Sequence, residues 1–226
     1  MPGDGVEREF KAMLEDAAER DRILSVIGGS IRVLAQRNLI FDTPTGALAA
    51  ARLSLRLRNE DTHWLLTAKG ETQTDPASLL TSRGEAERPV HAALALHLAA
   101  GTAAPLPLLR EAAPAPMAHA LADAIEAAAC GAPLGIVGEF RNERTLCPVI
   151  IAGGLPITVA LDCSEMPDGS VEHELELEVP HSALAPAAAF LDDLMRRAGV
   201  PLRPALSKRQ RFARALARRD AARRSA

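Results

Sequence analysis

The stretch GVEREFKAML, residues 5–14, alternates between charged and mainly apolar positions. Glu7, Glu9 and Lys11 occupy every second position, and Val6, Arg8 and Phe10 fill the gaps. Because successive side chains of an extended chain point to opposite faces, this spacing predicts a strand with one face that carries only charge. A single strand of this kind is typical of a sheet with its charged side in water, so its meaning depends on the rest of the chain.

The same alternation recurs in RLSLRLR (52–58), WLLTAKG (64–70), SRGEAERPV (82–90) and VEHELELEVP (171–180). One of these strands aligns three carboxylates on a face, and another aligns two arginines. Such rows repel unless complementary charge or a metal lies opposite them. If the sheet closes into a barrel, the charged faces point inward and the amphipathic helices cover the apolar faces from outside. We therefore expect a tunnel lined by charge.

Period-two segments predict strands over 6–13, 51–58, 63–69, 81–90, 155–162 and 171–179, with further strands near 37–41 and 134–150. Helical patterns fall at 15–27, 89–100, 117–129 and 182–198. The predicted class is α+β with an antiparallel sheet. The Ala- and Pro-rich segment 99–118 indicates a surface connection between two helices and not a domain boundary.

Length and composition favour one main domain over residues 1–214, followed by a basic helical tail or linker over 215–226. The formal net charge of −3 gives no general reason to expect a nucleic acid or a membrane as partner. Three cysteines without metal-ligand spacing favour reduced thiols. Since no signal peptide or membrane-spanning run is found, we expect a cytoplasmic protein.

Both signs of charge are abundant in the predicted lining. Its acidic side chains are Glu7, Glu9, Glu85, Glu87, Asp162, Glu174, Glu176 and Glu178. Its basic side chains are Lys11, Arg56, Arg58, Lys69, Arg83, Arg144, Lys208 and Arg211. Arginine and lysine suit phosphate oxygens, and clustered carboxylates suit a hard divalent cation that also bridges to phosphate. The predicted ligand is a polyphosphate together with a metal ion.

Six motifs in chain order resemble the CYTH superfamily, the triphosphate tunnel metalloenzymes, and bacterial inorganic triphosphatases among them. They are EREFK (7–11), FDTPTGALAAARLSLRLR (41–58), WLLTAKG (64–70), SRGEAE (82–87), HELELEV (173–179) and LSKRQR (206–211). The resemblance implies a closed eight-stranded antiparallel β-barrel with flanking helices. The sequence departs from the family pattern at Phe212, where the family usually has glycine. Arg141 and Arg144 are ambiguous, because their spacing places them on opposite faces of a strand unless a bulge lies between them; the family position favours Arg144.

The resemblance also implies roles for these residues. The metal ligands for Mg²⁺ or Mn²⁺ would be Glu7, Glu9, Glu174 and Glu176, supported by Asp162 and Glu178. The eight basic side chains named above would hold phosphate oxygens. Lys69, Glu85 and Glu87 are the candidate catalytic side chains, and either glutamate could position the attacking water. Glu87 alternatively pairs with a lysine of the tunnel.

Three functions compete at this point. Hydrolysis of inorganic triphosphate is the first, because the phosphate-binding set is complete and no base-recognition element is evident. Thiamine triphosphatase or class IV adenylate cyclase chemistry is the second. A non-catalytic polyphosphate-binding module is the third, since related longer proteins often carry a C-terminal CHAD domain, which these residues do not include. The oligomeric state is left open.

Overall fold

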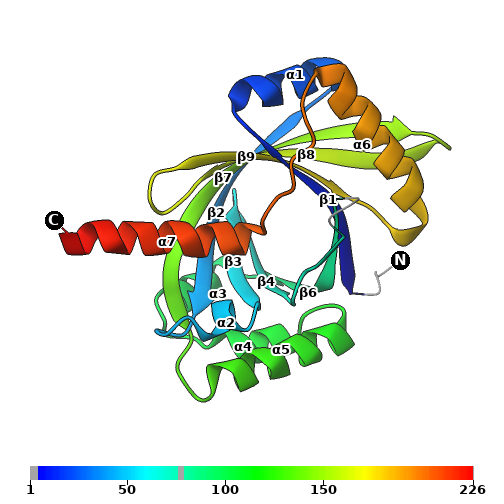
Figure 1. Ribbon diagram of the computed structural model, residues 1–226. Coiled ribbons are helices and arrows are strands. Elements are labelled where there is room, and N and C mark those ends of the chain that lie inside the picture. The colour runs from blue at the N-terminus through cyan, green and yellow to red at the C-terminus, as the bar shows by residue number, and fades with distance from the viewer. Residues whose placement is uncertain (1–4, 76–78, 226) are drawn as a thin grey trace.

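The sheet of the protein closes on itself (Figure 1). In the computed structural model, which describes residues 5–75 and 79–225, the ring strands pair antiparallel with both neighbours, and the pairing of β1 with β6 completes the ring. In order around the barrel, the eight strands are β1 (Val6–Leu14), β9 (Val171–Glu178), β8 (Leu155–Glu165), β7 (Gly135–Ile151), β2 (Arg32–Asp42), β3 (Ser54–Glu60), β4 (His63–Lys69) and β6 (Leu80–Val90). A short further strand, β5 (Gln73–Asp75), pairs with β6 beside the ring. The predicted closed antiparallel barrel is confirmed.

Helices cover the apolar outer faces of the strands in two groups (Figure 1). One group is α1 (Ala17–Ile27) and α6 (Leu184–Ala198), with a 3₁₀ turn at His181–Ala183 before α6. The other is α2 (Ala47–Ala50), α3 (Ala92–Ala99), α4 (Pro105–Arg110) and α5 (Ala115–Ala129). Leu175 and Leu177 of β9 are buried in the first cluster, and Leu55 and Leu57 of β3 in the second. Apolar burial outside the barrel therefore directs the alternating charged residues inward.

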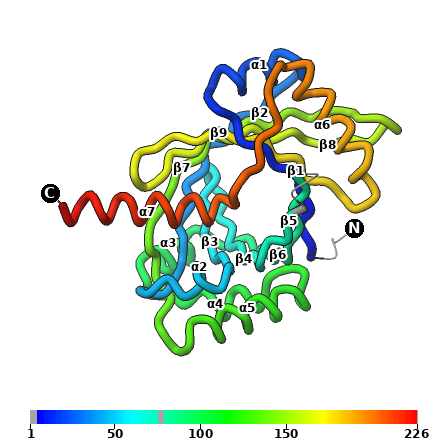
Figure 2. The backbone as a smooth tube through the Cα atoms, in the orientation of Figure 1, coloured from blue at the N-terminus to red at the C-terminus, as the bar shows by residue number. Residues whose placement is uncertain are grey.

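Helix α7 (Lys208–Ser225) crosses one end of the barrel, as the tube in Figure 2 shows. Its Phe212 packs on Phe140 of β7, with ring centroids 6.0 Å apart, in a small apolar cluster with Ile40. A Cβ atom on Gly138 would lie 3.1 Å from the Phe212 ring, so the glycine leaves the space that this phenylalanine fills. The departure at Phe212 is thus accommodated by a glycine on the facing strand.

The structure corrects the prediction for segment 99–118. The segment contains α4, which begins at Pro105 and buries Leu109 completely in the core with Ala112. It is therefore part of the helical layer and not a surface connection; its high proline content masked a helix that starts at a proline. The predicted strand at 51–58 in fact begins at Ser54, because α2 and a turn precede it. Helix α7 continues through position 214, and residue 226 of the predicted tail lies outside the described residues.

Among the described helices, none is both long and apolar enough to cross a membrane.

Candidate active site

A cavity of about 810 Å³ lies inside the barrel and collects most of the predicted site residues. Those that line it are Glu7, Glu9, Lys11, Arg56, Arg58, Lys69, Arg83, Glu85, Glu87, Arg144, Glu176, Glu178 and Lys208. Asp162 and Glu174 lie behind this lining and contact it through ion pairs, and Arg211 lies further back, where it pairs with Glu174 and Glu172. Arg144 faces the lumen whereas Arg141 is exposed outside, as the family position favoured.

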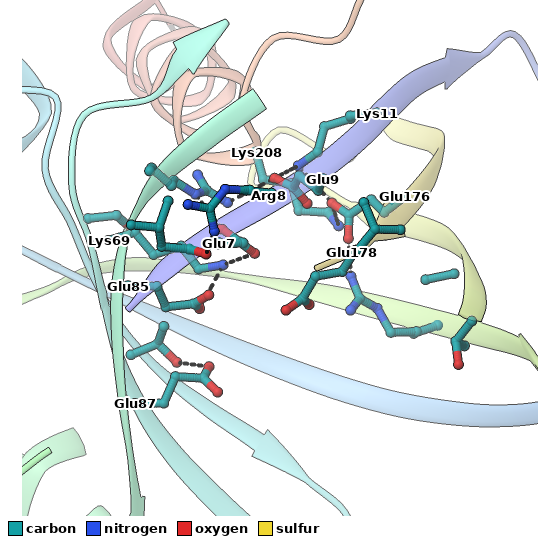
Figure 3. A pocket seen from close by; sticks show the side chains of 18 of the residues that line it. Glu7, Arg8, Glu9, Lys11, Lys69, Glu85, Glu87, Glu176, Glu178 and Lys208 are labelled. Carbon is teal, nitrogen blue, oxygen red and sulfur yellow. Dashed lines mark hydrogen bonds and ion pairs between the residues drawn. The ribbon is translucent and has the colours of Figure 1, made fainter. Parts of the chain in front are cut away.

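At one wall of the cavity, Lys69 joins the candidate carboxylates of two strands (Figure 3). Its Nζ lies 2.7 Å from Glu7 Oε1 and 2.8 Å from Glu85 Oε1. Arg83 adds contacts from its Nε to Glu7, at 2.6 Å, and from its Nη2 to Glu9, at 3.2 Å. Burial alone would raise the pKa of Glu7, but Lys69 and Arg83 hold it well below its ordinary value. Glu7 is therefore a charged carboxylate at neutral pH.

The two candidate water-positioning glutamates differ in their surroundings. Burial and the charges of Glu7 and Glu87 raise the pKa of Glu85, against the opposing effect of Lys69. Glu87 accepts a hydrogen bond from Thr67 Oγ1 at 2.9 Å, so its partner is a hydroxyl and not a tunnel lysine. The raised pKa of Glu85 suits it to accept a proton, and Glu87 is held by Thr67, its register partner on β4.

The second charged group is a set of three buried carboxylates on neighbouring strands. Asp162 of β8 and Glu174 and Glu176 of β9 present oxygens within 4.8 Å of one another. The ammonium of Lys208, from the start of α7, contacts all three. Burial opposes ionisation of Glu176, but Lys11, Lys208 and Arg144 hold its pKa well below its ordinary value. The pKa of Glu174 is instead raised by burial and by the charge of Glu176, despite Lys208.

The donor chemistry of this cluster fits a hard divalent cation. Three convergent carboxylates can each give an oxygen ligand, which is the set that Mg²⁺ and Mn²⁺ prefer. Glu9 lies close to this group through Lys11, whose Nζ is 3.1 Å from Glu9 and 2.8 Å from Glu176. Glu178 lies apart from the three and extends into the cavity from the side opposite Glu85 (Figure 3).

Arg56 and Arg58 form a wall of the cavity whose positive charges are not paired with carboxylates of the described residues. They lie on the lumen face of β3, opposite Thr67 and Leu65 of β4. Among the described residues, neither guanidinium forms an ion pair with a carboxylate, although the other six predicted cations all do. Burial and the neighbouring Arg58 lower the pKa of Arg56 to about 10, against the attraction of Glu87 and Glu85. This wall therefore keeps positive charge available for an anion.

Residues outside the predicted set hold the site in place. Asn142 donates to Asp162 Oδ1 at 3.0 Å, and Ser164 in turn donates to Asn142 at 3.0 Å. The segment before α7 is held to α1 by Arg203, whose Nη1 lies 2.7 Å from Glu19 Oε2. These contacts join residues far apart in sequence, and no local pattern reveals them.

A basic side chain that α7 contributes to the cavity was also missed. Arg209 follows Lys208 on α7 and lines the same cavity, and its Nη1 donates to the carbonyl of Ala49 at 2.9 Å. It lies between Lys208 and Arg211 of LSKRQR, at a position where the motif specifies no residue. No sequence signal marks it, because a helical wheel places Arg209 about 100° from Lys208 and so not on the same face.

A CYTH domain model matches residues 5–213, nearly the whole chain. The chain belongs to the CYTH family. Its CYTH fold is similar to HpAC1 from Hippeastrum, described as an adenylyl cyclase candidate with a dominant triphosphatase activity, at 22% identity and a TM-score of 0.75 over 92% of this chain and 95% of that one. An adenylate cyclase candidate from Bacillus halodurans has 19% identity and a TM-score of 0.60, over 92% of this chain and 98% of that one.

A third CYTH-like fold is the PH1012 protein of Pyrococcus horikoshii OT3, at 16% identity and a TM-score of 0.53, over 88% of this chain and 96% of that one. Among curated protein sequences, none matches this chain. At these identities the structural neighbours support the CYTH fold.

Proposed function

We propose that this CYTH protein hydrolyses inorganic triphosphate to diphosphate and phosphate in its barrel cavity, with Mg²⁺ or Mn²⁺. The observation that supports this most directly is the contrast between two walls. Arg56 and Arg58 have no carboxylate partner among the described residues, and across the lumen lie the three clustered carboxylates. A multiply charged phosphate chain would pair with the arginines of the first wall. A divalent cation that also binds the phosphate oxygens would pair with the carboxylates of the second.

In this proposal the cations hold and neutralise the substrate, which is the main demand of phosphoryl transfer. Arg56, Arg58 and Lys69 would bind non-bridging phosphate oxygens, together with Lys11, Arg83, Arg144 and Lys208. Arg211, which the sequence predicted as a further phosphate ligand, lies behind the lining and would instead hold Glu174 in place. Glu85 would accept a proton from the attacking water, helped by its raised pKa. No covalent nucleophile is needed.

The residues that would hold the metal are Asp162, Glu174 and Glu176, with Glu7, Glu9 and Glu178 as further candidate ligands. When bound, the divalent cation would supply charge neutralisation of the phosphate oxygens. Lys208 already compensates this cluster, so its ammonium would turn toward the substrate as the cation binds. The three free cysteines support a reducing compartment, for which we propose the cytoplasm.

A second candidate is a triphosphate with an organic group, as in a thiamine triphosphatase or an adenylate cyclase. It is favoured by an apolar part of the lining, which comprises Leu146, Pro156, Ile157 and Ala160. Against it, Phe140 is the one phenylalanine, tyrosine or tryptophan that the described lining contains, and its ring already packs on Phe212. Among the described lining residues, the cavity thus offers no free phenylalanine, tyrosine or tryptophan ring on which a base could stack.

The deciding experiment compares phosphate release from tripolyphosphate, thiamine triphosphate and ATP by the purified chain with each metal, and tests the ATP reaction for cyclic AMP. Faster turnover of tripolyphosphate than of either organic substrate is expected. Preferential turnover of an organic triphosphate would overturn the proposal in favour of the second candidate. Tight tripolyphosphate binding without turnover would instead indicate a binding module.

A further inference from the structure

Arg209 is a cavity cation that the proposed chemistry does not use. It lies at the start of α7, where the helix meets the end of α2, and it is half-buried. Its one described hydrogen bond runs from Nη1 to the carbonyl of Ala49. Since a guanidinium has five N–H donors, most of its donors remain for a ligand.

The charge of Arg209 has no carboxylate to balance it. Among the described residues, no Asp or Glu forms an ion pair with it, and Asp42 is the main acid that attracts it electrostatically. The Asp42 carboxylate is already occupied, because it accepts backbone N–H bonds from Thr43, Leu48 and Ala49 at 2.7, 2.8 and 3.0 Å. These bonds hold α2 in place and occupy both oxygens of the carboxylate.

Arg209 also extends the positive charge beyond the lumen cations. Burial lowers the pKa of Arg209, Asp42 opposes this, and the charges of Arg83 and Arg52 lower it further. Arg83 belongs to the group around Glu7 inside the cavity, whereas Arg52 is exposed outside it. Arg209 therefore adds positive charge to the cavity from its half-buried position at the start of α7.

We propose that Arg209 binds a phosphate beyond the three held within the lumen, so that the protein binds linear phosphate chains of four or more units more tightly than tripolyphosphate. The inference rests on the proposed function only in that phosphates occupy the lumen. An unpaired guanidinium at the rim offers charge-assisted hydrogen bonds to the next phosphate in the chain, and tripolyphosphate is too short to use them.

The test measures binding by titration calorimetry, with tripolyphosphate and tetrapolyphosphate as probes, without metal so that hydrolysis does not interfere. The wild-type chain should bind tetrapolyphosphate about fivefold more tightly at low salt, which is the order expected for one partly exposed charge pair. Arg209→Gln keeps a donor for the Ala49 carbonyl but loses the charge, so it should abolish this preference and leave tripolyphosphate binding within about twofold.

Arg214→Gln is the matched control, because Arg214 lies on the same helix but is exposed to solvent away from the cavity. It should keep the wild-type preference. Equal affinity of the wild-type chain for both probes would overturn the proposal without any variant. An equal loss for both probes in Arg209→Gln would also overturn it, since that result indicates that the residue only fixes α7 to α2. Should this variant not fold, Arg209→Lys, which keeps the charge, must retain the preference.

The outcome is separate from that of the proposed function. A protein that binds the longer chain through Arg209 but hydrolyses no phosphate would support this inference and contradict the triphosphatase. A protein that hydrolyses tripolyphosphate but binds both chain lengths equally would support the proposed function and contradict this inference.

Discussion

Lys11 Nζ lies 2.8 Å from Glu176 Oε1, and the two side chains are only 5% and 11% exposed. The pair joins β1 to its neighbouring strand β9, where the two residues are direct register partners. Burial of both charges is costly unless they compensate each other. The cavity therefore holds an ion-pair network in which most of the candidate metal ligands and phosphate ligands bind one another, and a bound phosphate chain or cation would replace some of these pairs.

This network predicts that hydrolysis depends on a divalent metal. Carboxylates that face a polyanion repel it unless a cation intervenes, so excess EDTA should abolish tripolyphosphate turnover, and Mg²⁺ or Mn²⁺ should restore it. Phosphate release before and after metal addition is the measurement. Full turnover in excess EDTA would contradict the metal role of the Asp162 cluster.

Glu176→Gln should lose both activity and stability. The change keeps the size of the side chain but removes the charge that Lys11, Arg144 and Lys208 share, so turnover should fall at least about a hundredfold. Uncompensated buried cations should also lower Tm. Glu165→Gln, at the exposed end of β8, is the control. A variant with unchanged Tm and near-normal turnover would show that Glu176 is merely a solvated carboxylate.

Arg56→Gln should separate stability from activity. Because the pKa of Arg56 is lowered to about 10 from 12.5, its charge destabilises the folded state at every pH below about 10, where it is protonated both folded and unfolded. Removing the charge should raise Tm without substrate and lower kcat/KM at least about tenfold. Arg218→Gln, in the exposed part of α7, should change neither Tm nor kcat/KM. A fall in Tm without loss of activity would exclude Arg56 as a phosphate ligand.

The raised pKa of Glu178 predicts that the stability of the protein depends on pH. Partial withdrawal of this side chain from water and the charges of Glu7 and Glu85 raise the pKa of Glu178 from 4.5 to about 7. Between these values the folded state binds the proton more tightly, so stability falls as pH rises and the loss is complete above about pH 7. Glu178→Gln should raise Tm at pH 8 and leave it almost unchanged at pH 4. An equal shift at both pH values would contradict a raised pKa.

The inward face of the barrel was predictable because alternation is a local property of a strand. Glu7, Glu9 and Lys11, or Arg56 and Arg58, are assigned to one face by their spacing alone, and the structure confirms that these residues line the cavity. The resemblance added the ring closure and the eight strands. The register of β7 is continuous from Arg141 to Arg144, so the two side chains lie on opposite faces, and spacing alone could not show which of them faces the lumen.

The ion pairs between side chains of different elements could not be predicted from the sequence. Nothing in LSKRQR indicates that Lys208 would lie among Asp162, Glu174 and Glu176, because the path of segment 199–207 decides it. The unpaired state of Arg56 is likewise a property of all surrounding side chains together. Arg209 was missed for the same reason.

Closure of the ring by β1 has a consequence for how the chain folds. Lys11 meets Glu176 across a separation of 165 residues, and Glu7 meets Arg83 across 76. Contacts so distant along the chain carry a large loop-closure entropy and slow the folding rate. During synthesis β1 leaves the ribosome long before β9 exists, so its edge on that side stays unpaired and open to other strands until then. The cavity can form only in the last stage of folding.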